Sequence, residues 1–139
     1  MRHTSRLTLP FLLLFLTACG QPQGDGLAAF SGTWSVTAFG EGGDSLTSYT
    51  LTAGADPSAW TMTFPGMAPV ALHVVSTAGD SVVVRTDSYP SVLEPDVHVT
   101  SEAVMKVQGD QISGTFLSHR TVMGPDSVLR GTARGARRE

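Results

Sequence analysis

The chain has no asparagine and only one cysteine, Cys19. A single cysteine excludes an intramolecular disulfide, so the fold must rest on apolar packing and backbone hydrogen bonds. Without asparagine, turns that need a positive φ fall mainly to glycine and aspartate. The apolar run over residues 7–16 is too short for a transmembrane helix, because crossing a bilayer takes about 20 apolar residues.

Motifs of nucleophilic, metal-dependent or phosphate-binding catalysis are also missing. The sequence contains no Gly-x-Ser-x-Gly, His-Glu-x-x-His, Ser-x-x-Lys, P-loop or Cys-x-x-Cys. His98 and Glu102 lie about 13 Å apart along one expected strand, too far for one metal ion, although His119 on the next strand approaches them. We therefore predict solvent-facing histidines, no metal site, no cofactor and no catalytic residues.

The N-terminal segment has the parts of a secretory signal: a basic start, the apolar run, and a small-residue cleavage site at Ala18. Leu16-Thr17-Ala18-Cys19 resembles the lipobox of bacterial lipoproteins. The resemblance implies cleavage before Cys19, lipidation of its sulfur and anchoring in a membrane of the cell envelope. A non-acidic residue after the cysteine, here Gly20, implies by the same resemblance the outer membrane, facing the periplasm.

Such cleavage divides the chain into four parts. Residues 1–18 are the signal peptide, 19–30 the lipidated cysteine and a flexible tether, 31–136 one domain, and 137–139 a basic tail. Seven basic and twelve acidic residues then remain, a net charge near −5. This balance argues against nucleic acid or an anionic lipid surface as a partner.

Beyond the tether, apolar residues recur at period two, the pattern of strands with one buried and one solvated face. Eight strands are predicted, over residues 33–39, 45–53, 59–64, 69–77, 81–86, 97–108, 111–119 and 127–134. Turns ending in aspartate precede four of them, at 43–44, 79–80, 109–110 and 125–126. The short connections favour an all-β antiparallel up-and-down meander, closed into a barrel that leaves no exposed edge. An open sheet or a β-sandwich is the alternative.

Gly32-Thr33-Trp34 opens the first predicted strand. Gly-x-Trp at the start of an eight-stranded meander resembles the lipocalin and calycin group, which implies a calycin-like barrel. In that group an arginine or lysine late in the last strand packs over the tryptophan. Arg134 is the best match and Arg130 the second, so the resemblance implies a Trp34–Arg134 cation–π pair, worth about 1 kcal/mol, at the barrel floor.

The predicted connections alternate in length, which matters because alternate connections of an up-and-down barrel lie at opposite ends. The larger loops are 40–44, 65–68, 87–96 and 120–126, so the mouth of a pocket, if the barrel holds one, should lie at their end. The candidates for ligand contact are Trp60, Met62, Phe64, Tyr89 and Phe116, with a filled core as the alternative. Loop 87–96 carries apolar residues and is a lid, a docking edge or a plug. Glu41, Glu94 and Asp96 lie on these loops, but nothing in the sequence gives them an acid–base role.

These observations predict a lipid-anchored, non-enzymatic cell-envelope protein that binds a small apolar ligand or an envelope partner. A structural or assembly lipoprotein with a filled core is the alternative. An envelope hydrolase or isomerase is least favoured, because no nucleophile–base set appears.

Overall fold

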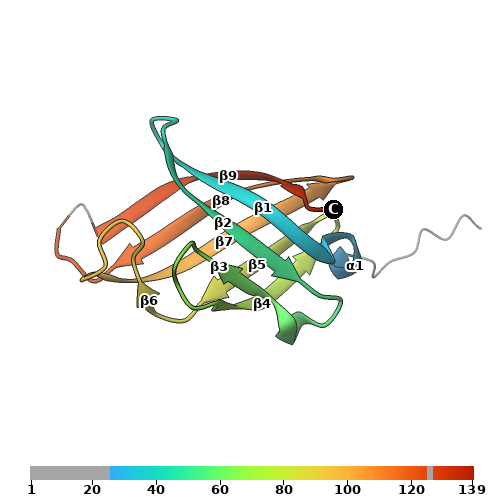
Figure 1. Ribbon diagram of the computed structural model, residues 1–139, viewed down its shortest axis with the longest axis horizontal. Coiled ribbons are helices and arrows are strands. Elements are labelled where there is room, and N and C mark those ends of the chain that lie inside the picture. Colours follow the sequence, from blue (N-terminus) through green and yellow to red (C-terminus); the bar gives the residue numbers. More distant parts are fainter. Residues whose placement is uncertain (1–25, 125–126) are drawn as a thin grey trace, which may run out of the picture.

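The computed structural model describes residues 26–124 and 127–139, so the predicted signal, Cys19 and the 125–126 turn lie outside the described residues. Within them the strands lie close to their predicted positions (Figure 1). The elements are α1 (Gly26–Phe30), β1 (Gly32–Gly40), β2 (Ser45–Ala53), the 3₁₀ turn η1 (Pro57–Ala59), β3 (Thr61–Thr63), β4 (Val70–Ala78), β5 (Ser81–Thr86), β6 (Tyr89–Pro90), β7 (His98–Gln108), β8 (Gln111–Arg120) and β9 (Val128–Arg137).

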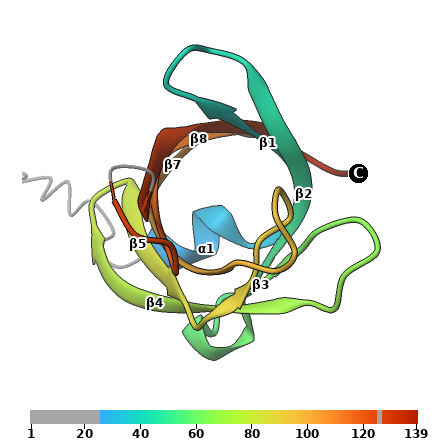
Figure 2. The same cartoon turned by 90° about the vertical axis from the view of Figure 1, so that its left-hand side faces the viewer.

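The sheet closes on itself as a calycin-like barrel of eight antiparallel strands with one extra strand. The order is β5-β4-β3-β2-β1-β9-β8-β7-β6, and β5 also pairs with β7, which completes the ring. Figure 2 looks along the barrel and shows this ring, with α1 visible through it at the far end. The prediction of an all-β closed meander is confirmed, and the open sheet and sandwich are excluded. The extra strand, β6, was not predicted because it has only two residues.

The glycine-aspartate turns are where the pattern placed them. Gly43, Gly79 and Gly109 have φ values of +88°, +60° and +60°. Residues other than glycine rarely adopt positive φ values, so these turn positions require glycine. Because the two-residue turns at 79–80 and 109–110 are tight, one end of the barrel is compact and the other carries the larger loops.

The predicted tether ends earlier than expected. Residues 26–30 form α1, and Phe30 is only 1% exposed. The helix lies at the tight-turn end, where it contacts β4 and β5 and closes the barrel (Figure 1). A five-residue helix has too little sequence to show a helical period, so it was missed.

Two tryptophans fill the closed end. The Trp34 indole N–H donates to the Phe30 carbonyl at 2.8 Å, and the Trp60 N–H donates to the Gly54 carbonyl at 2.8 Å. The Phe30 and Trp60 rings pack with centroids 5.6 Å apart. Each indole is thereby buried with its polar atom satisfied, as burial requires.

The prediction of a Trp34–Arg134 pair was wrong. Arg137 is the arginine over Trp34, with its guanidinium 4.2 Å from the ring, whereas Arg134 lies over Phe39 at 4.7 Å. Along β9 the odd-numbered residues face inward, so Arg134 and Arg130 point outward. The basic-tail prediction also fails at Arg137, because β9 extends to that residue and pairs it with Trp34.

Candidate functional site

The barrel interior is hollow at the end of the larger loops. A cavity of about 190 Å³ opens there, opposite α1. The lining combines apolar side chains, hydroxyl groups and one pair of opposite charges, from residues that include Leu46, Tyr49, Met62, Phe64, Thr86, Tyr89, Val92, Glu94, Ser101, Ala103, Phe116, Ser118 and Arg120. The prediction that a pocket would open at this end is confirmed.

Four of the five candidate ligand residues line this cavity: Met62, Phe64, Tyr89 and Phe116. Their contact with a ligand stays a prediction. Trp60 does not line the cavity, because it packs against Phe30 at the closed end. The chain leaves η1 immediately before Trp60, and β3 begins at Thr61. The alternation of Trp60 with Met62 thus predicted correctly that both side chains face the barrel interior. It did not show that Trp60 lies nearer the closed end than the cavity.

An aromatic wall stands on one side of the cavity. The Phe64 ring lies between Tyr49, at 5.5 Å between centroids, and Tyr89, at 5.9 Å and nearly parallel. Burial raises the pKa of the Tyr49 hydroxyl, with a smaller contribution from nearby Tyr89, and burial also raises the pKa of Tyr89. Both phenols are therefore neutral groups that offer a hydrogen bond at physiological pH.

A line of hydroxyl groups crosses from this wall to the opposite strands. The Tyr89 hydroxyl lies 3.1 Å from Ser101 Oγ, which lies 2.6 Å from Ser118 Oγ. Thr86 Oγ1 accepts from the Ser101 backbone N–H at 2.9 Å. These contacts hold the hydroxyl groups in place, so the cavity offers fixed polar positions beside an apolar surface.

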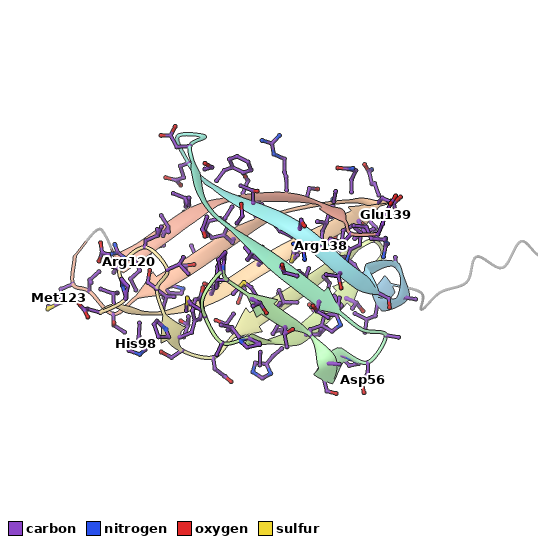
Figure 3. The ribbon with its side chains drawn as sticks, in the orientation of Figure 1. Asp56, His98, Arg120, Met123, Arg138 and Glu139 are labelled. Carbon is purple, nitrogen blue, oxygen red and sulfur yellow. The ribbon has the colours of Figure 1, made fainter. Side chains whose placement is uncertain are left out.

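Glu94 and Arg120 are the two charged residues of the lining. Their side chains form an ion pair with Arg120 Nη2 2.6 Å from Glu94 Oε2. The Arg120 side chain is 18% exposed and that of Glu94 is 55% exposed. The cation therefore sits deeper than the anion. Figure 3 shows Arg120 toward the loop end, far from Arg138 and Glu139 at the closed end.

The loop from Asp87 to Val97 covers the mouth. Its start is held by β6, which pairs with β7, and its tip is a turn in which Ser91 Oγ accepts from the Leu93 and Glu94 backbone N–H groups at 3.2 and 3.3 Å. Val92 packs against the core. Of the three interpretations of this loop, the packing favours a plug over the barrel end, and Figure 2 shows the loop crossing the opening.

A second, open hollow of about 810 Å³ also takes in part of this loop. The residues that line both spaces are Thr47, Phe64, Tyr89, Ser91 and Val92. The second hollow also takes in residues 67–71 on the neighbouring loop. The two spaces therefore adjoin one another beside the covering loop.

The other polar candidates do not converge. His98 and His119 are exposed, and Glu102 pairs instead with Arg85 across the outside of the sheet, at 2.6 Å. Glu41 and Asp96 do not line the cavity. Among residues 26–124 and 127–139, no three histidine, cysteine or carboxylate side chains group as metal ligands would.

The cavity residues that the sequence candidates did not include are mostly apolar, but they also include Tyr49, Ser101, Ser118 and Arg120. Ser101 and Ser118 share the inward parity of their strands, a signal present in the sequence. Arg120 shares the parity of Phe116 but lies one residue past the predicted strand end at 119. Polar side chains are not expected in the interior of a barrel. Hydroxyl groups are nevertheless tolerated there when neighbouring groups form hydrogen bonds with them.

Comparisons with known proteins add no relative. No protein-family model matches the chain, and no curated protein or solved structure matches it. Among the described residues, no helix has the length and apolar character needed to cross a membrane.

Proposed function

We propose that this chain is a lipid-anchored cell-envelope protein that holds a small, mainly apolar molecule inside its barrel. The observation that carries the proposal is the cavity of about 190 Å³. An engineered apolar cavity of about 150 Å³ is large enough to bind benzene. A barrel whose role is purely structural has no need for such a space, since small eight-stranded barrels can be filled by side chains.

The lining supports a ligand rather than stored water. Apolar residues and the Tyr49–Phe64–Tyr89 wall supply most of the surface, and a few fixed hydroxyls supply direction. Ligand sites of proteins likewise combine a mainly apolar lining with a small number of placed polar groups. The anchor rests on the basic start, the apolar run and Cys19, and the outer membrane, facing the periplasm, is the expected location.

Native mass spectrometry of the protein purified from its own envelope tests the binding role. We expect a bound small molecule with the wild-type protein and its loss in Ala103→Phe, which places a ring in the cavity. Val104→Phe is the matched control, because Val104 is the next residue of β7 and is 39% exposed on the outer face. Repeatedly empty spectra of the wild-type protein would support the structural alternative.

A further inference from the structure

We propose that the molecule held in the cavity carries a carbonyl oxygen, as a ketone, ester or amide does, and that this oxygen accepts a hydrogen bond from the Tyr49 hydroxyl. The inference rests on the proposed binding function and names the chemical class of the ligand. It starts from the hydroxyl groups of the lining, because they have more protons to donate than the protein itself uses.

Tyr49 supplies the first free donor. It is an inward-facing residue of β2 that lines the cavity and packs against the core. Within residues 26–124 and 127–139 its hydroxyl forms no hydrogen bond. Every fully enclosed side-chain nitrogen or oxygen in that part of the chain has a hydrogen-bond partner, so an unpartnered hydroxyl must face open space. For Tyr49 that space is the cavity that it lines.

The line of hydroxyl groups on the opposite strands supplies a second free donor. Tyr89, Ser101 and Ser118 have one hydroxyl proton each, and the two contacts between them use two of these protons. The third proton has no acceptor in the described part of the chain. A ligand that only donates hydrogen bonds would leave both free protons unmatched, which is costly in a cavity shielded from water.

A neutral acceptor oxygen fits these donors. Burial raises the pKa of the Tyr49 hydroxyl, so this group keeps its proton at physiological pH and can donate it. The Phe64 ring packs against Tyr49, with the two centroids 5.5 Å apart. A charged group beside these rings would lose most of its hydration, whereas a carbonyl group loses less and regains a hydrogen bond.

Isothermal titration calorimetry tests this with four aromatic probes that have the same number of non-hydrogen atoms: acetophenone, α-methylstyrene, indole and benzoate. Acetophenone has a carbonyl acceptor, α-methylstyrene has a methylene group in place of that oxygen, indole only donates, and benzoate is charged. We expect Tyr49→Phe to weaken acetophenone binding about fivefold, as the loss of one neutral hydrogen bond predicts, and to change the binding of α-methylstyrene and indole by less than about twofold. Benzoate should bind the wild-type protein more weakly than acetophenone does.

Thr50→Val is the matched control, because it also removes one hydroxyl group and nearly preserves the shape of the side chain. Thr50 is the next residue of β2, faces outward and does not line the cavity. This variant should leave the affinity for every probe unchanged. The Tm of ligand-free Tyr49→Phe should equal or exceed that of the wild-type protein, since the hydroxyl that is removed has no partner among the described residues.

A lower Tm of ligand-free Tyr49→Phe would show that the hydroxyl serves the fold, and overturns the inference. Equal effects of Tyr49→Phe on acetophenone and α-methylstyrene, an effect on indole as large as that on acetophenone, or tighter binding of benzoate than of acetophenone also overturns it. In each of these cases the binding role stands. Binding of none of the four probes to the wild-type protein overturns both.

Discussion

The Arg137 side chain joins several parts of the barrel floor. Its guanidinium lies over Trp34, donates to the Ala29 carbonyl at 3.0 Å and to the Ser31 carbonyl, and reaches Asp110 at 3.1 Å. It therefore ties α1 and the tight turn at 109–110 to the barrel floor. Gly32 allows this approach, because its φ is +128° and a Cβ there would crowd the guanidinium.

We expect Arg137→Ala to lower the free energy of unfolding by about 2 kcal/mol, since it removes a cation–π contact and charge-assisted hydrogen bonds that are partly shielded from water. Arg134→Ala, on the outside of the same strand, should cost at most about 1 kcal/mol. Urea denaturation of the two variants measures the difference. Equal losses would show that Arg137 does not hold the floor.

Glycine decides how closely the late strands approach. A Cβ at Gly114, Gly131 or Gly135 would collide with a backbone carbonyl oxygen of the neighbouring strand, from Val104, Phe39 and Ser35 respectively. Missing side chains at these positions let β8 and β9 coil tightly, which a small closed barrel requires.

Gly135→Ala should therefore destabilise the protein by about 2–3 kcal/mol, because the backbone of β1 must move to admit the methyl group. Gly42→Ala is the control: no atom lies within 4 Å of a Cβ there, and it should change stability by less than about 0.5 kcal/mol. Thermal unfolding followed by circular dichroism compares the two. A neutral Gly135→Ala would mean that strand spacing adapts freely.

At the scale of the whole molecule the two ends of the barrel differ: one end is filled with side chains and the other is hollow. Gly26, the first described residue, lies at the filled end, and the mouth lies opposite. Gly26 comes seven positions after Cys19, a reach of about 25 Å at full extension. A lipid on Cys19 would therefore place the closed end toward the membrane and leave the mouth facing the aqueous compartment.

The anchor makes its own prediction. Cys19→Ala should move the protein from the membrane to the soluble fraction when cells are fractionated without detergent, because no acyl chain then remains to insert. Arg137→Ala, which leaves the cysteine intact, should stay in the membrane fraction. Retention of Cys19→Ala with membranes would count against lipidation at this residue.

Much of the fold was readable from the sequence. Period-two patterning gave the eight strands of the barrel, and glycine-aspartate pairs gave the tight turns, because both depend on residues a few positions apart. The alternation of loop lengths gave the open end, since an up-and-down barrel fixes which loops share an end. Four of the five candidate cavity residues followed from the same patterns.

What the tertiary structure decided are the relations between distant residues. Trp60 was expected in the cavity but lies in the barrel floor. Arg134 was expected over Trp34, but Arg137 occupies that position. Arg120 meets Glu94 only because β8 ends beside the covering loop. Strand registers and the level of a side chain along a barrel depend on how strands are staggered around the ring, and no local pattern carries that information. The sequence by itself determined which faces are buried; closure determined which side chains meet.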